Sequence, residues 1–246
     1  MAPTDLPATL LAPDAADVDE VIARLQAICA ALPPSDGVSC FAAMYLVVTQ
    51  AVQASITAGA FESSAFLTAL DVHFANRFFE ALSSMSQGRS CRRCWKVLID
   101  RRSAADVSPL QFALAGMNAH INFDLALAVV DTLDGSGGNP NDGPWHSDFA
   151  RVNVLLDRLE PQIREKLLAS SVFAAAGDAG DSFADFGIAS SREVAWRAGQ
   201  ALWPIRHQGF LRDGLTGVID EAVAASSDAL LSGLPWIRPQ LPTGGP

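Results

Sequence analysis

The residues best suited to chemistry lie in the segment Leu110–Val130, in which Asp124 is the only formally charged side chain. His120 precedes Asp124 by four residues, so on a helix the two side chains lie beside each other on one face. A carboxylate next to a histidine orients the imidazole and raises its basicity, as a general base requires, and the two groups can also bind a metal ion together. The spacing therefore predicts acid–base or metal chemistry within an apolar helix.

Two amide side chains are expected on the opposite side of that helix. At about 100° per residue, Asn118 and Asn122 share a sector with aliphatic side chains. His120 and Asp124 lie roughly opposite, with Met117 at their flank. An unpaired buried amide costs about 1 to 3 kcal/mol, so these polar groups need partners or a ligand. They form either a functional site or an internal hydrogen-bond network that fixes the register of the helix.

Further polar side chains lie on helical patterns that would otherwise be core. His73 and Arg77 are four residues apart, with Asn76 beside them, and they converge on the pocket of His120 if their helices pack antiparallel. The alternative is that Arg77 forms a surface ion pair. Asp148 either stabilises a helix N-terminus or serves as a ligand. The candidate catalytic residues are thus His120, Asp124, Asn118, Asn122, His73 and Arg77, and the candidate substrate-binding residues are Asn76, Asn153, Asp148, Trp196 and Met117.

The apolar spacing predicts the elements that position these residues. Apolar side chains recur every three or four residues and no segment demands a β-strand, so we expect an all-α fold. We expect a single multi-helix bundle in which the helix from Ser108 to about Leu133 is buried at the centre, with Ser108 as its N-cap. The other helices are expected at about residues 15–32, 39–59, 66–82, 90–103, 149–167, 190–203 and 210–231.

The sequence also predicts where helices are interrupted or capped and which segments form loops. Pro161 is expected to kink or split its helix, and Ser190 with Glu193 is expected to form a capping box. The Gly-rich segment 134–144 is expected to be a mobile loop near the pocket mouth, and residues 174–187 a second loop. Residues 15–232 then form one domain between flexible ends at 1–14 and 233–246.

Composition narrows the class of protein. Hydrophobic residues make up 50% of the chain and charged residues 18%, which indicates a large core and excludes disorder. The formal net charge of −10 repels nucleic acid and anionic lipid, so neither is an expected partner. Four cysteines, too few for a disulfide framework, and a start without the basic region of a signal peptide favour the cytoplasm. The uncharged residues 37–61 contain a continuous apolar run of only nine residues, Cys40–Val48, which predicts a core helix and no membrane span.

Common cofactor motifs are missing from the sequence. No Gly-rich dinucleotide or phosphate-binding motif is present, so we expect no nucleotide cofactor. Cys91 and Cys94 form a CxxC pair without a second pair or a suitably spaced histidine, which argues against a zinc finger. A divalent metal is still allowed, with His120, Asp124 and His73 as its ligands. The sequence leaves the oligomeric state open.

One segment resembles a known family. The run Gly116-Met117-Asn118-Ala119-His120-Ile121-Asn122, followed by Asp124-Leu125, is similar to the signature of the largely actinobacterial domain-of-unknown-function family 5995. Weaker similarity extends from about residue 37 to 205, at Ala75-Asn76-Arg77, Trp95, Asp148-Phe149, Asn153 and Ala195-Trp196. Family members usually have proline where this chain has Ala126, so the helix either continues through Asp124 or begins anew there. The resemblance implies a helical, soluble bacterial domain without an agreed activity.

Three classes of function fit these residues. The first is an enzyme of specialised metabolism, a lyase, cyclase or isomerase, that holds a small apolar substrate in a helical pocket and uses His120 and Asp124 as acid and base. The second is a metal-dependent hydrolase with His73, His120 and Asp124 as ligands, joined by Asp71 or Asp148. The third is a non-catalytic protein that binds a small apolar molecule and uses its amide and imidazole groups only to orient it.

Overall fold

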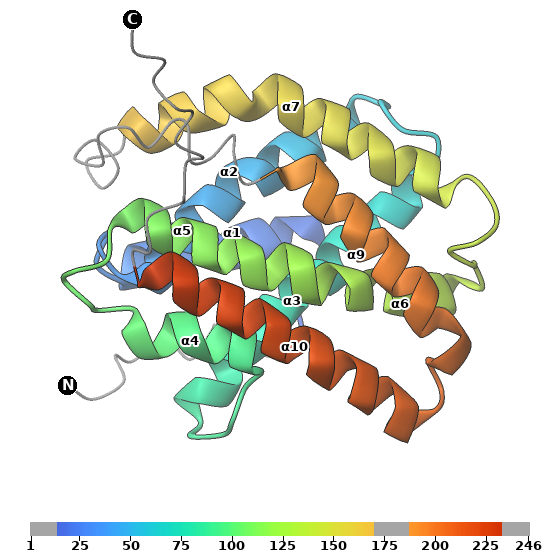
Figure 1. The fold of residues 1–246 in the computed structure, drawn as a ribbon. Helices are drawn as coiled ribbons and strands as arrows, with labels where there is room; N and C mark the ends of the chain where they lie inside the picture. Colours follow the sequence, from blue (N-terminus) through green and yellow to red (C-terminus); the bar gives the residue numbers. More distant parts are fainter. Residues whose placement is uncertain (1–13, 170–186, 233–246) are drawn as a thin grey trace, which may run out of the picture.

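The computed structural model describes residues 14–169 and 187–232 (Figure 1). Every regular element within these ranges is a helix, which confirms the all-α prediction. The helices are α1 (Val18–Ala31), α2 (Gly37–Thr57), α3 (Ser64–Ser86), α4 (Arg93–Arg101), α5 (Pro109–Ala119), α6 (Leu125–Ser136), α7 (Trp145–Ala169), α9 (Ile188–Leu202) and α10 (Gly209–Leu231). The flexible ends expected at 1–14 and 233–246 and the loop expected at 174–187 lie almost wholly outside the described residues.

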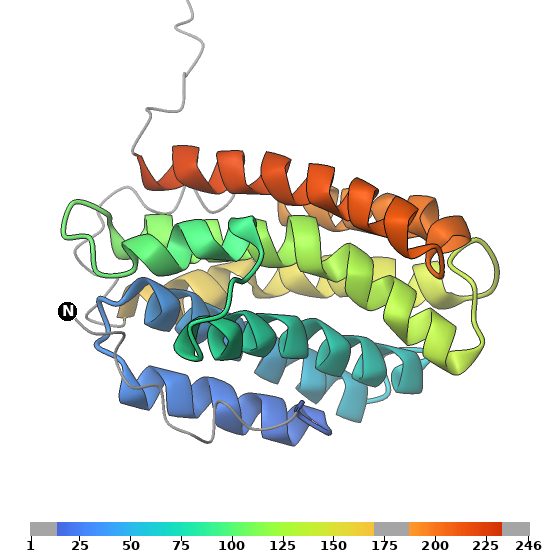
Figure 2. The same cartoon turned by 90° about the horizontal axis from the view of Figure 1, so that it is seen from below.

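The central helix consists of α5, a π-helical turn at His120–Asp124, and α6. It continues through Asp124 without a break, so Asp124 does not begin a new helix. Figure 2 shows this helix between α10 on one side and α2 and α3 on the other. From Phe112 to Val130 every residue except Asn122 is buried. The central helix is therefore enclosed on all sides, as its lack of polar residues predicts.

Local sequence signals determine where the central helix begins and ends. Ser108 Oγ accepts the backbone N–H of Gln111 over 3.3 Å, and the Gln111 side chain accepts the N–H of Ser108 over 3.0 Å. This reciprocal cap satisfies two N–H groups that the first turn leaves without helical partners. At the other end Gly137 has φ +69°, a left-handed conformation that glycine adopts without strain.

Helix α2 packs unusually close to α5 at Gly116. A Cβ atom at this position would lie only 2.4 Å from the ring of Phe41, so a larger residue does not fit. The close approach brings two aromatic residues of α2 beside the π-helical turn: the rings of Phe41 and Tyr45 lie 5.5 and 4.6 Å from the imidazole of His120.

Two sequence expectations concern the later helices. Helix α7 is not split at Pro161 and runs to Ala169. Helix α9 begins at Ile188 after a left-handed Gly187, so Ser190 lies inside the helix and forms no capping box. Glu193 instead bonds His146 and Arg197 through its side chain. The capping-box prediction was wrong because the N-cap of the helix is Gly187, three residues before Ser190.

Two helices are long and apolar enough to cross a membrane by length and composition. In α2 the most apolar window is 56% buried inside the fold, and in the central helix, Pro109–Ser136, it is 94% buried. The core helix of a globular fold meets the same criteria, so these two helices are weak evidence for a membrane span.

Candidate functional site

His120 and Asp124 are joined by a hydrogen bond inside the core. His120 Nδ1 lies 3.0 Å from Asp124 Oδ2, and each of the two side chains is only 3% exposed. The indole N–H of Trp95, on α4, donates to the same carboxylate oxygen over 2.9 Å. The structure thus forms the predicted pair and adds a tryptophan that was not among the candidate site residues.

The π-helical turn carries this pair. The N–H of Leu125 bonds to the carbonyl of His120, five residues back, so the helix is wider here than an ordinary α-helix. Such turns are rare, and they occur frequently at functional sites. His120 and Asp124 stand at the two ends of the turn.

The imidazole of His120 is neutral and has a free lone pair. Burial lowers the pKa of His120 below its ordinary value, and the hydrogen bond to Asp124 opposes that shift. An ionised carboxylate only accepts hydrogen bonds, so Nδ1 carries the proton and Nε2 does not. Nε2 is buried and has no hydrogen-bond partner. An unprotonated nitrogen whose ring is held by a carboxylate is the form in which histidine acts as a general base.

An apolar cavity of about 70 Å³ adjoins His120. Its wall consists of side chains from α2, α3, the central helix, α7 and α9, among them Phe41, Phe74 and Met117. The ring of Phe74 stacks on the imidazole, with 3.4 Å between centroids and 8° between planes. Met117, predicted to bind substrate, therefore lies in the wall of the cavity.

The Gly-rich segment 134–144 lies elsewhere. None of the described residues that line the cavity belongs to it. The reason is that the first nine residues of α6, which span about 14 Å, separate Asp124 from the start of the segment, and residues 134–136 still belong to α6. The expectation that this segment lies near the pocket mouth was wrong.

Two polar residues of the cavity wall are missing from the candidates that the sequence indicated. Tyr45 lines the cavity, and its hydroxyl is buried without a hydrogen-bond partner. Arg192 also lines it, donates to Asn153 Oδ1 over 2.6 Å and lies over the ring of Phe149 at 4.3 Å. Tyr45 is the single tyrosine of the chain, and Arg192 stands at a core position of α9. Both residues are polar side chains at apolar positions of a helical pattern, and this signal in the sequence could have identified them.

Burial shifts the pKa values of ionisable side chains near the cavity. Burial lowers the pKa of Arg192 to about 10, an effect that the charge of Asp71 opposes. Burial raises the pKa of Asp71 to about 7, and the charge of Arg192 opposes this shift. The pKa of the Tyr45 hydroxyl lies well above its ordinary value, first through burial and then through the charge of Asp71, and the nearby Thr49 hydroxyl opposes both effects. Tyr45 thus stays protonated at neutral pH and is able to donate a hydrogen bond.

A second, polar cavity of about 300 Å³ lies beside Asp124. Trp95, Arg77 and Arg92 also line it. His120 belongs to the wall of the apolar cavity and Asp124 to that of the polar one. The hydrogen bond between them therefore links the two cavities.

The chain matches the model of one protein family over most of its length. A family model, described as a family of unknown function (DUF5995), matches residues 18–233. The chain belongs to DUF5995. The match covers most of the chain and confirms the predicted resemblance to this family. No curated protein and no solved structure matches the chain.

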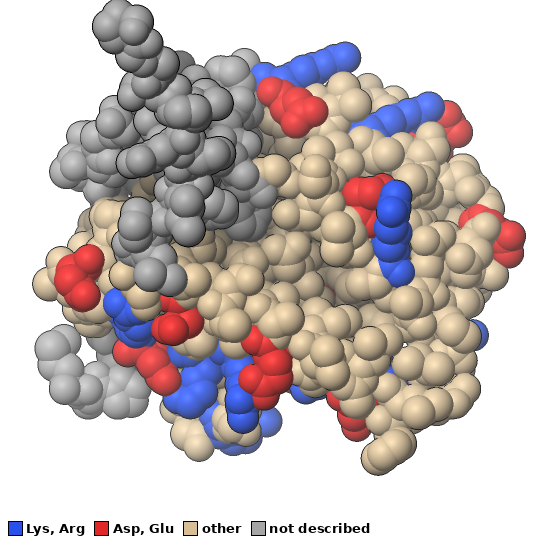
Figure 3. Space-filling model, in the orientation of Figure 1, with Lys and Arg blue, Asp and Glu red and all other residues tan. Residues whose placement is uncertain are grey.

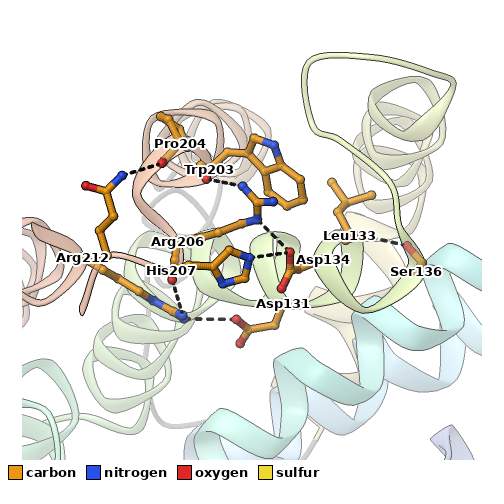
Figure 4. Close-up of polar contacts among 10 residues, drawn as sticks. Asp131, Leu133, Asp134, Ser136, Trp203, Pro204, Arg206, His207 and Arg212 are labelled. Atoms are coloured by element: carbon orange, nitrogen blue, oxygen red, sulfur yellow. Dashed lines mark hydrogen bonds and ion pairs between the residues drawn. The ribbon is translucent and has the colours of Figure 1, made fainter.

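In this DUF5995 domain His73 and Arg77 do not join His120 as expected. His73 is exposed, because α3 turns the next residue, Phe74, towards the core. Arg77 lines the polar cavity and forms an ion pair with Asp131. The other oxygen of Asp131 accepts from Arg212 over 3.1 Å, as Figure 4 shows. Helix α3 therefore contributes Phe74 to the apolar cavity.

Other candidates have structural partners in this DUF5995 domain. Asn118 donates to the carbonyl of Val223 and to Ser227 Oγ, both on α10, and accepts from Asn122 over 2.8 Å. Asn76 pairs with the backbone of Ala15. These contacts join helices to one another, and none of the three asparagines lines either cavity. We therefore assign these three asparagines a structural role outside the candidate site.

The remaining candidates lie along α7 and α9. Asp148, in the first turn of α7, is fully buried and accepts the backbone N–H groups of Glu62 and Ser63, which precede α3. Asn153 Oδ1 accepts a hydrogen bond from the side chain of Arg192. Trp196 packs on the ring of Phe149, with 4.9 Å between centroids, and does not line the apolar cavity. Of these three, Asn153 acts closest to the site, through the arginine that it positions.

The three-residue metal set proposed from the sequence does not form. Among the described residues no three His, Cys, Asp or Glu side chains converge in a way that would hold a metal ion. His73 is exposed while His120 and Asp124 are buried, which places the three in different environments. This removes the support for a hydrolase based on His73, His120 and Asp124.

Proposed function

We propose that the protein is an enzyme that moves protons on a small, mostly apolar substrate, a reaction of the isomerase, lyase or cyclase kind. The observation that carries this proposal is the neutral His120, with Nδ1 held by Asp124 and Nε2 unpartnered beside an apolar cavity. A core histidine with a purely structural role would have partners for both nitrogens, because an orphaned polar atom costs about 1 to 3 kcal/mol.

In this function His120 is the base, and Asp124 is the residue that positions it. Removal of a proton from the substrate converts the imidazole to an imidazolium, whose charge the adjacent carboxylate stabilises. The apolar wall excludes water, which strengthens that attraction and prevents loss of the proton to solvent. The same imidazolium then returns the proton to another atom of the substrate or of an intermediate.

Proton transfer in deuterated water tests the proposal even though the substrate is unidentified. The protein is incubated with a mixture of small apolar metabolites in deuterium oxide, and chromatography with mass spectrometry detects compounds that gain deuterium. We expect at least one to gain carbon-bound deuterium with the wild type and none with His120→Gln. His73→Gln is the matched control, because that histidine is exposed and lies outside the cavity.

The result also separates an enzyme from a binding protein. Retention of a metabolite by both the wild type and His120→Gln, with no deuterium gained in either, would reject catalysis and favour a non-catalytic carrier. The predicted cytoplasmic location and the absence of nucleic-acid and membrane partners stay predictions from composition, supported by the net charge of −10.

A further inference from the structure

Two buried, unpartnered polar atoms belong to residues that line the same small apolar cavity. Tyr45 Oη and His120 Nε2 are both buried, neither has a hydrogen-bond partner, and both residues line the cavity. The two rings are 4.6 Å apart, with 72° between their planes. They come from different helices, α2 and the π-helical turn, which the close contact at Gly116 brings together.

The two atoms have opposite hydrogen-bonding characters. The Tyr45 hydroxyl is protonated and donates, whereas Nε2 of the neutral imidazole offers a lone pair and accepts. A ligand that pairs with both atoms carries an oxygen that accepts the hydrogen bond from Tyr45. Next to that oxygen it carries a group that can lose a proton to His120 Nε2. The rest of the wall is mainly aliphatic and aromatic, so the remainder of that ligand is apolar.

Arg192, which carries a positive charge, also lines the same cavity. Arg192 is fixed by Asn153 and by the carbonyl of Phe149, over 2.6 and 3.2 Å. A fixed cation and a fixed hydroxyl stabilise negative charge that develops on an oxygen atom during a reaction. The wall of the cavity thus favours an oxygen that becomes more negative when a proton is removed nearby.

We infer that the cavity binds the carbonyl end of a small, mostly apolar ketone or aldehyde, and that Tyr45 is a second catalytic residue. This inference rests on the proposed function and names its substrate class. Tyr45 donates a hydrogen bond to the carbonyl oxygen while His120 Nε2 removes a proton from the neighbouring carbon. The cavity of about 70 Å³ adjoins both residues and limits the ligand to a small molecule.

The step balances without any further reagent. The carbon–hydrogen bond breaks, its proton goes to Nε2, and its electron pair forms a carbon–carbon double bond to the carbonyl carbon. The π electrons of the carbonyl group move onto oxygen, which Tyr45 stabilises. Return of the proton to a different carbon of a conjugated system gives an isomer, with no oxidation or reduction.

Matched probes test the substrate class separately from catalysis. Cyclopentanone carries the carbonyl group, and methylenecyclopentane has nearly the same shape without the oxygen. We expect the wild type to bind the ketone at least about tenfold more tightly than the hydrocarbon, since one buried hydrogen bond contributes roughly this much. The signal of carbon-13 at the phenol carbon reports the contact directly, because Tyr45 is the single tyrosine of the chain.

Two variants provide the controls. Tyr45→Phe keeps the ring and is expected to abolish the preference for the ketone. Thr132→Val removes another buried, unpartnered hydroxyl, on α6, that does not line the cavity, and it is expected to leave the preference intact. Equal binding of both probes by the wild type, or an unchanged preference in Tyr45→Phe, would overturn the inference.

Exchange of the ketone's α-hydrogens in deuterium oxide separates this inference from the proposed function. Enzyme-accelerated exchange that is lost in His120→Gln and reduced in Tyr45→Phe supports both. A ketone preference that depends on Tyr45, without exchange, supports the carbonyl class and counts against proton abstraction by His120. No binding of the ketone, with metabolite turnover still dependent on His120, would overturn the substrate class alone.

Discussion

Asp124 holds two other buried side chains of the candidate site. Its Oδ2 accepts from Trp95 on one side and faces His120 Nδ1 on the other. The indole N–H is the only polar group in the side chain of Trp95, so Asp124 satisfies all of its hydrogen-bonding capacity. The carboxylate therefore stabilises the core and also determines which nitrogen of His120 carries the proton.

Substitutions at Asp124 should separate these two roles. Asp124→Ala leaves the N–H groups of Trp95 and His120 without this acceptor, so we expect the free energy of unfolding to fall by about 2 to 5 kcal/mol. Asp124→Asn keeps one acceptor oxygen and is expected to cost clearly less. Urea unfolding measures both, with Asp157→Asn, an exposed aspartate on α7, as the control.

The same amide variant should change the tautomer of His120. In the wild type we expect a proton on Nδ1 and none on Nε2, because burial lowers the pKa of His120 and Asp124 accepts the Nδ1 proton. In Asp124→Asn the neutral side chain no longer enforces this form, so both tautomers are populated. Nitrogen-15 NMR of the histidine rings distinguishes them. A wild-type His120 protonated on both nitrogens at pH 7 would refute the assignment of His120 as a base.

Asn118 is expected to affect stability and not binding. Asn118→Ala removes the hydrogen bonds to Val223 and Ser227 and leaves Asn122 without its partner, so we expect a loss of about 1 to 3 kcal/mol. Ketone binding and the tautomer of His120 should not change. Asn122→Ala, which removes only one of these bonds, is the smaller matched change. Loss of ligand binding in a folded Asn118→Ala protein would show that Asn118 belongs to the functional site.

The shape of the apolar cavity depends on the close contact between helices α2 and α5. Gly116→Ala places a methyl group 2.4 Å from the Phe41 ring, so the helices must separate or the ring must move, at a cost of about 1 to 3 kcal/mol. Gly217→Ala, on α10, has nothing within 4 Å and should raise stability by up to about 1 kcal/mol through its higher helix propensity. The two glycine-to-alanine changes are thus expected to shift the urea midpoint in opposite directions. A shift in the same direction would show that α2 and α5 do not meet as described.

The whole molecule presents a face with few charged side chains. Figure 3 shows this face, on which many of the acidic and basic groups lie next to each other. Among the described residues the exposed large hydrophobic side chains include Phe210, Leu211 and Val218, all on α10. Some charged side chains form ion pairs, such as Arg206 with Asp134 in Figure 4, and this partly exposed pair is expected to contribute little to stability.

The stability of the whole fold should depend on pH through Asp71. Burial raises the pKa of Asp71 from 3.8 to about 7 in the folded protein. Between these values the folded state binds a proton that the unfolded chain has lost, so the contribution of Asp71 to stability decreases as the pH rises. Asp71→Asn removes this titration. Its free energy of unfolding relative to the wild type should rise from about pH 4 to about pH 7 and then level off, and a constant difference in urea titrations would contradict the assignment.

The sequence by itself determined the helices and the burial of the central one. The three- and four-residue spacing of apolar side chains is a local property, and so is the cap at Ser108. Asp124 and His120 were predicted as a pair for the same reason, because a separation of four residues places two side chains together on one face of an α-helix. The start of α9 was misjudged, since Gly187 and Ser190 are both acceptable beginnings and only the fold selects one.

The tertiary structure decided which polar residues share a cavity. Tyr45 and Arg192 lie more than a hundred residues apart in the chain, and no periodicity relates them to His120. His73 and Phe74 are neighbours whose directions differ by about 100°, so a small rotation of α3 determines which of them meets the imidazole. Helix rotation and packing are set by the sum of many contacts between segments distant in sequence. The spacing within one helix therefore predicts its own face, and only the packed structure shows what that face meets.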